Sequence, residues 1–242
     1  PISYLKSNTE LEFLSRGIPV SLASGDSLAL DVHKFQMINH RVSGFSPFVT
    51  FTFLKADINV GDKKEPIGIF IRRGKVPVWS FDEIVEPTLN EPLSLLVKEL
   101  TAKINSVVYK QSISNTDVES LIQKIKTKTK GKSRATYLDV YQLGFGNNPS
   151  AIPYLKELTS STDEYKRQAA ISSLGILKAV DEIDFLKSSY VNGNSWADKA
   201  MSLKAIGDLG TEEAIAFLKQ EQATFANDAK KYWVNDLVNL YL

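Results

Sequence analysis

Apolar residues after about residue 117 recur at helical spacing, and the same pattern returns three times. The three segments align without a gap on Gly144, Gly175 and Gly207, which are 31 and 32 residues apart. One, four and six positions before each glycine stands an apolar residue: Leu143, Val140 and Leu138, then Leu174, Ile171 and Ala169, then Ile206, Leu203 and Met201. This spacing predicts a helix with one apolar face. The glycine is expected to end that helix by adopting a left-handed C-cap.

A second short helix is predicted after each glycine. A five-residue motif occurs at 152–156, 183–187 and 215–219. It consists of isoleucine, any residue, an aromatic residue, leucine and lysine. It predicts a helix that turns its isoleucine, aromatic and leucine side chains inward. Ser161 and Glu164 have capping-box spacing, which places a helix start at about Asp163. Because neither helix of a pair buries its apolar face alone, neighbouring pairs are expected to stack.

The two ends of the repeated region look like the ends of such a stack. The stretch from Asp117 to Lys126 falls one period before the first complete second helix and predicts an opening half-unit. The stretch from Ala229 to Leu242 predicts a closing cap helix whose terminus packs. We therefore predict an all-α domain over residues 113–242 with three units and a terminal cap helix.

The repeated region resembles the HEAT-repeat family, in particular the short units of phycobilisome-lyase-type HEAT proteins. The residues that carry the resemblance are Arg167-Gln-Ala-Ala170 with Leu174-Gly175, and Asp198-Lys-Ala200 with Ile206-Gly207. It covers the chain from about Asp117 to Leu242. It implies an α-solenoid, and such arrays commonly bind another macromolecule.

The N-terminal part reads as a small α+β domain over residues 1–112. Alternating apolar positions from 17 to about 87 predict an antiparallel sheet of four or five strands. Turns are expected at Gly61-Asp62 and at Arg73-Gly74-Lys75, and Val76 and Val78 around Pro77 suggest an edge strand. A helix over residues 91–109, with Pro92 in its first turn, is expected to cover the sheet. Residues 111–115 are expected to form a hinge, and the fold class is α+β: an antiparallel sheet with a covering helix, then a HEAT-like α-solenoid.

Composition narrows the class of protein. The 242 residues are 43% hydrophobic and 24% charged, with a formal net charge of +1, which argues against nucleic-acid binding driven by bulk charge. The sequence has no cysteine, so it has no disulfide, thiolate metal site or cysteine nucleophile. No apolar run reaches the roughly 20 residues of a transmembrane helix. The lack of cysteine slightly favours an exported protein of the periplasm or cell envelope over a cytoplasmic one, and a lipoprotein is one form this hypothesis takes.

No catalytic, cofactor-binding or metal-binding set is predicted. The two histidines, His33 and His40, are interpreted as surface residues, because with Asp31 they lack the three or four convergent ligands of a metal site. Carboxylate pairs such as Glu182 with Asp184 are read as solvated helix faces. Trp196 near Asp198, at a predicted helix start, is a weak hint of the aromatic-plus-acid arrangement of HEAT-like nucleic-acid glycosylases.

A basic run is the strongest charge feature, and it gives the candidate site. Six basic residues fall within eleven positions: Lys124, Lys126, Lys128, Lys130, Lys132 and Arg134. They suggest docking to an anionic surface, while the alternative is a solvated loop between helices. The function predicted from these features is a non-enzymatic scaffold that binds an unidentified protein partner. The alternative is a HEAT-like enzyme or factor, glycosylase-like or lyase-like, that acts on nucleic acid or a bound cofactor.

Overall fold

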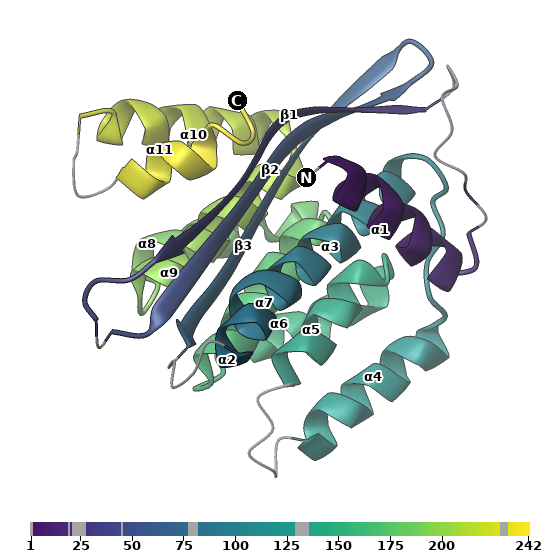
Figure 1. Cartoon of the computed structure of the whole chain (residues 1–242), viewed down its shortest axis with the longest axis horizontal. Coiled ribbons are helices and arrows are strands. Elements are labelled where there is room, and N and C mark those ends of the chain that lie inside the picture. The colour runs from purple at the N-terminus through teal and green to yellow at the C-terminus, as the bar shows by residue number, and fades with distance from the viewer. Residues whose placement is uncertain are drawn as a thin grey trace. The chain divides into compact units, whose positions relative to one another are not determined.

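The computed structural model describes residues 2–18, 20, 28–44, 46–76, 82–128, 136–227 and 232–242. Its fold is α+β, and it divides into two compact units, which we call the sheet unit (1–108) and the helical unit (109–242) (Figure 1). The sheet unit contains α1 (Ile2–Ser15), β1 (Ala29–His40), β2 (Phe48–Val60), β3 (Lys63–Val76), α2 (Asp82–Val85), a short π-helix (Glu86–Asn90) and α3 (Glu91–Val107).

Among the described residues the sheet has three antiparallel strands in the order β1-β2-β3, fewer than the four or five predicted. The predicted turn at Gly61-Asp62 joins β2 to β3, and Gly61 has the positive φ of 55° that favours glycine in a tight turn. The predicted turn at residues 73–75 is wrong, because these residues lie inside β3. There the register slips between the pairs Phe48–Val76 and Thr50–Arg73, which is the mark of a β-bulge. Pro77 and Val78 lie outside the described residues.

The predicted covering helix is confirmed as α3, which packs against β2 and β3. Leu96 and Leu100 of α3 are fully buried, as are Ile69 and Ile71 on β3. The Lys103 ammonium is also buried, and it donates to the backbone carbonyl of Gly68 on β3.

Helix α1 was not predicted from the sequence. Its buried positions, Leu5, Thr9 and Phe13, are interrupted by apolar residues that face solvent, including Leu11 and Leu14. Because apolar residues lie on several sides of this helix, no single apolar face appears in the sequence pattern.

The helical unit is built from successive helix pairs. Its elements are α4 (Asn115–Lys128), α5 (Thr136–Phe145), α6 (Ile152–Leu158), α7 (Glu164–Ile176), α8 (Ile183–Asn192), α9 (Trp196–Leu209), α10 (Glu212–Phe225) and α11 (Tyr232–Val238). The first helices of the pairs, α5, α7 and α9, pack against one another in turn, and α11 packs against α9 and α10 (Figure 1). Short 3-10 turns at Pro149–Ala151 and Val180–Glu182 precede α6 and α8.

The repeated glycines do not end the first helices, so their predicted role as C-caps is wrong. Gly144, Gly175 and Gly207 lie inside α5, α7 and α9, and the residues with positive φ stand three positions later: Asn147, Lys178 and Gly210. A β-carbon on Gly175 would lie 2.5 Å from Ala205 Cα in α9, and one on Gly144 would lie 2.7 Å from Ser173 Oγ in α7. These glycines therefore let successive first helices approach closely.

Local contacts at two other places correct the predictions. Helix α7 does start after Asp163, but Asp163 is itself the cap and accepts from the backbone amides of Tyr165 and Lys166. Ser161 instead accepts from the backbone amide of Asp163. In the predicted hinge, the backbone amide of Ile113 donates to the Gly146 carbonyl, and the Ile113 carbonyl accepts from the Asn148 side chain. These two hydrogen bonds fix this part of the predicted hinge within the helical unit.

Candidate functional site

The second helices are joined by a repeated contact that we call the lysine–aromatic row. The lysine of each element lies over the aromatic ring of the next: Lys126 over Tyr154 at 5.1 Å, Lys156 over Phe185 at 5.5 Å and Lys187 over Phe217 at 5.6 Å from nitrogen to ring centroid. Each contact has cation–π geometry. The leucines of the repeated motif, Leu155, Leu186 and Leu218, are fully buried as predicted. The aromatic rings are not simply inward, because the preceding lysine covers them.

Ion pairs accompany this row. Lys156 pairs with Glu182 at 2.7 Å and Lys187 pairs with Glu213, and in both cases the carboxylate follows 26 residues after the lysine. Tyr190 of α8 donates to Glu221 of α10 at 2.6 Å. Burial, together with the Glu221 carboxylate, raises the pKa of Tyr190 above its ordinary value. The second helices thus share a regular set of polar contacts from one unit to the next.

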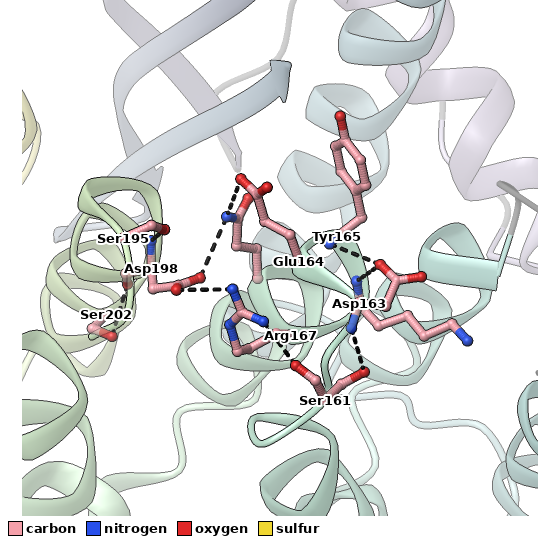
Figure 2. A network of polar contacts seen from close by, with 10 residues as sticks. Ser161, Asp163, Glu164, Tyr165, Arg167, Ser195, Asp198 and Ser202 are labelled. Atoms are coloured by element: carbon pink, nitrogen blue, oxygen red, sulfur yellow. Dashed lines mark hydrogen bonds and ion pairs between the residues drawn. The ribbon is translucent and has the colours of Figure 1, made fainter. Parts of the chain in front are cut away.

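A polar network links α7 to α9 where the second pair meets the third (Figure 2). Arg167 Nη2 donates to Asp198 Oδ2 at 3.0 Å, and Arg167 Nη1 donates to the Ser161 carbonyl at 2.7 Å. Asp198 also accepts from Gln168, and its backbone amide donates to the Ser195 cap at 3.2 Å. The exposed fractions of the two charged side chains are 12% for Arg167 and 3% for Asp198, so the ion pair is largely removed from water.

A cavity of about 220 Å³ lies beside this network, and we call it the junction cavity. Arg167 and Asp198 form part of its wall, and Ile171 and Phe185 give it an apolar side. Its other walls come from the residues that follow α6, from the last turns of α8 and from the loop before α9: Thr159, Ser160, Ser188, Ser189, Asn192, Gly193 and Asn194. The cavity therefore combines hydroxyl and amide groups, one ion pair and one aromatic ring.

The sequence carries a signal for one part of this site. Arg167 and Asp198, which belong to the residues of the family resemblance, also stand 31 residues apart, which is one repeat period. Opposite charges one period apart on stacked first helices lie close enough to pair. The cavity itself depends on how two interhelix turns fold back, and no periodic pattern encodes that.

The predicted basic run is only partly described. Lys124 pairs with Asp139 of α5 at 2.7 Å, and Lys126 belongs to the lysine–aromatic row. Lys128 is the last residue of α4, and its side chain is not among those described. Lys130, Lys132 and Arg134 lie outside the described residues. Two of the six predicted docking residues thus have contacts within the helical unit, and the proposed anionic partner stays a prediction.

The histidines do not come together. His40 is the last residue of β1. The irregularity of β1 between Val32 and Lys34 turns His33 toward Asp57 of β2, and the His33 Nε2 contacts Asp57 Oδ2. Lys64 binds the same oxygen at 2.8 Å. Among the described residues, no group of three or more histidine, aspartate or glutamate side chains is placed to hold a metal ion.

The pKa of Asp57 is set by opposing effects. Burial alone would raise it, but the hydrogen bonds and positive charges of Lys64 and His33 outweigh burial and hold the pKa below its ordinary value. A carboxyl with a lowered pKa in the folded state stabilises that state above its unfolded-state pKa. The contribution is lost as the pH falls through the lower folded-state pKa.

Replacing Asp57 by asparagine is therefore expected to have a pH-dependent effect on stability. Near neutral pH the loss should be below about 1 kcal/mol, because the Lys64 ammonium is largely exposed and screened. The difference from the parent chain should shrink as the pH drops below about 3.9, the ordinary value for aspartate. Urea denaturation from pH 7 to pH 3 measures this, with Asp62→Asn in the adjacent turn as the control. A difference that stays constant over this range would contradict the role of Asp57.

Trp196 opens α9 and packs against Trp233 of α11 with ring centroids 6.2 Å apart, and 43% of Trp196 is exposed. Asp198, the acid of the glycosylase hypothesis, is engaged by Arg167 as described above.

In the part of the chain that the structure describes, no helix has the length and apolar character needed to cross a bilayer. Comparisons with protein-family models, curated proteins and solved structures find no match to this chain.

Proposed function

We propose that the helical unit is a HEAT-like, non-enzymatic scaffold that binds a protein partner along its second helices. The observation that carries this proposal is the regular row that α6, α8 and α10 form. Their lysine–aromatic contacts and ion pairs repeat from unit to unit, so equivalent positions recur on the solvent side, although the residues at these positions differ. A regular row of this kind suits an extended partner.

The solvent side of the row has a defined chemistry. Positions four residues apart on each second helix are exposed, and together they form what we call the exposed strip: Pro153 and Glu157 on α6, Asp184 and Ser188 on α8, and Ala216 and Gln220 on α10. The strip contains two acidic residues, and the exposed Lys219 lies beside it on the same face of α10. This mixture of charges favours a protein partner over nucleic acid, because phosphate contacts need several lysine or arginine residues.

Photo-crosslinking in the source cells tests the scaffold. A benzophenone amino acid would replace Glu157, Ser188 or Gln220, one at a time, in the full chain. We expect one defined protein to crosslink from at least two of these three positions, and the purified pair to bind in solution. The matched control is the same substitution at Thr162, an exposed residue outside the strip. Equal crosslinking from Thr162, or no protein from the strip, would exclude the proposal.

A further inference from the structure

The junction cavity holds polar groups that have no partner among the described residues. The side chains of Ser160, Ser189 and Asn194 line it, and the structure gives none of them a hydrogen bond within the part of the chain it describes. Ser160 and Asn194 are exposed and Ser189 is half-buried, so water reaches all three side chains. Three polar groups that line one cavity are thus available to a ligand. A ligand that takes the place of this water must replace the hydrogen bonds that water makes to them.

Stacking of the repeats does not require this polar lining. The positions of Ser188 and Ser189 in α8 correspond to Glu157 and Leu158 in α6 and to Gln220 and Glu221 in α10. A buried ion pair is likewise not needed for stability, since apolar residues of similar volume usually serve as well. The junction between the second and third helix pairs therefore differs from the other junctions in the residues that line the cavity.

The close approach of the backbone also shapes this site. Gly193 lies in the cavity wall, and a β-carbon there would stand 2.8 Å from the Ser189 carbonyl oxygen and 3.3 Å from Asp198 Cβ. Neighbouring atoms thus occupy the space that a side chain at residue 193 would need, and glycine lets the loop pack closely against α8 and α9 here.

The charges of the cavity restrict its ligand to an uncharged group. Among the residues that the structure describes, Arg167 and Asp198 are the only ionic ones in its wall, and they are already paired with each other. A bound carboxylate would meet Asp198, and a bound ammonium would meet Arg167. An aliphatic group would leave the hydroxyl and amide groups without partners. A group that both donates and accepts hydrogen bonds fits the serine hydroxyls and the asparagine carboxamide, which also do both.

We infer that the junction cavity binds the carboxamide side chain of a glutamine or asparagine from the protein partner, with its methylene carbons against Phe185 and Ile171. This inference rests on the proposed scaffold function. It names one anchor residue of the partner and places it at the end of α8, next to Ser188 of the exposed strip.

Nuclear magnetic resonance titration of the full chain tests the inference with defined probes. The probes are the peptide acetyl-Gly-Gln-Gly-amide, its counterparts with glutamate or methionine in place of glutamine, and methyl glucoside. We expect saturable shifts of the Ser189, Gly193 and Asn194 backbone amides with the glutamine peptide. A millimolar dissociation constant is reasonable for so small a ligand, and the other probes should bind at least about tenfold more weakly.

A matched pair of variants ties binding to the cavity. Ser189→Leu fills it with the residue that the first unit carries at the same position, Leu158, so the fold is expected to tolerate the change. It should weaken binding of the glutamine peptide at least about tenfold, because the leucine side chain removes the Ser189 hydroxyl and fills the space that the ligand needs. Thr162→Leu, outside the cavity, should leave binding unchanged.

Several results would overturn the inference. Binding of the glutamate peptide as tight as that of the glutamine peptide would mark an anion site. Preferential binding of methyl glucoside would mark a carbohydrate site, and no shift with any probe would remove the site. A partner that crosslinks to the strip while the glutamine peptide does not bind would leave the scaffold standing and exclude only the carboxamide. Peptide binding without any crosslinked partner would exclude the scaffold and with it the assignment to a partner residue.

Discussion

Substituting Asp208 by alanine is expected to lower the free energy of unfolding of the helical unit by about 3–5 kcal/mol, the cost of removing one partner of a buried ion pair. Lys204 and Asp208 lie one turn apart on α9, with Lys204 Nζ 2.6 Å from Asp208 Oδ2. The exposed fractions of their side chains are 0% and 1%. Without this carboxylate the Lys204 ammonium loses one ion pair in a site that water does not reach.

The C-terminal segment shares this network. The Tyr241 hydroxyl donates to Asp208 Oδ1 at 2.7 Å, and the Tyr241 ring lies against Gly207. The residues that stand at the position of Lys204 in the other units are Ser172 and Tyr141, so stacking alone does not call for a charge there. The ion pair therefore belongs to the contact between α9 and the C-terminal segment, and it helps to hold that segment in place.

A double-mutant cycle separates the charge effect from the loss of packing. Lys204→Met removes the ammonium and keeps most of the volume. The double variant Lys204→Met, Asp208→Ala should be more stable than Asp208→Ala alone, since no buried charge is left without its partner. Guanidinium denaturation of the four proteins gives the coupling free energy. Additive losses from the two substitutions would show that the pair is not coupled.

The sequence predicted the repeat register well because that information is local and periodic. The apolar residues before Gly144, Gly175 and Gly207 do lie buried in stacked helices, except for Leu138, which is half-buried. The role of the glycines was missed for a physical reason. Glycine inside a helix costs about 1 kcal/mol relative to alanine. A glycine after an apolar helical pattern is therefore more readily interpreted as the end of the helix than as part of it. Only the distance between two helices shows that a side chain has no room there.

The sheet unit shows a different limit of sequence reasoning. The alternation that marks strands was recognised, but Arg73-Gly74-Lys75 reads as a turn in the sequence and forms a bulge in β3. A glycine flanked by basic residues suits both structures, and strand pairing with Thr50 decides between them.

The candidate site was also only partly predictable, because one part of it is periodic in sequence and the other is not. The charges of Arg167 and Asp198 could be paired from the repeat period, whereas the cavity beside them arises from two turns that are distant in sequence.

Gly175→Ala is expected to lower the free energy of unfolding by about 2–3 kcal/mol, although alanine is the better helix former by up to about 1 kcal/mol. The added β-carbon would lie 2.5 Å from Ala205 Cα and 2.9 Å from the Ala205 carbonyl oxygen. Both are backbone atoms of a helix interior, so they cannot turn aside as a side chain can. Helices α7 and α9 must separate, and the buried contacts between them are weakened.

Two further substitutions make this prediction specific to the close approach. Ser172 lies on the same helix, fully buried, and its hydroxyl has no hydrogen-bond partner among the described residues. Ser172→Ala should therefore be neutral or stabilising. Gly207→Ala would meet the Tyr241 ring, a side chain that can move, so its cost should fall between the other two. Thermal and guanidinium denaturation of the three variants give the order, and a neutral Gly175→Ala would show that helix separation is not what this glycine controls. Should the order hold, the repeated glycine sets how closely α7 and α9 stack, and so the spacing of α6 and α8 that the exposed strip depends on.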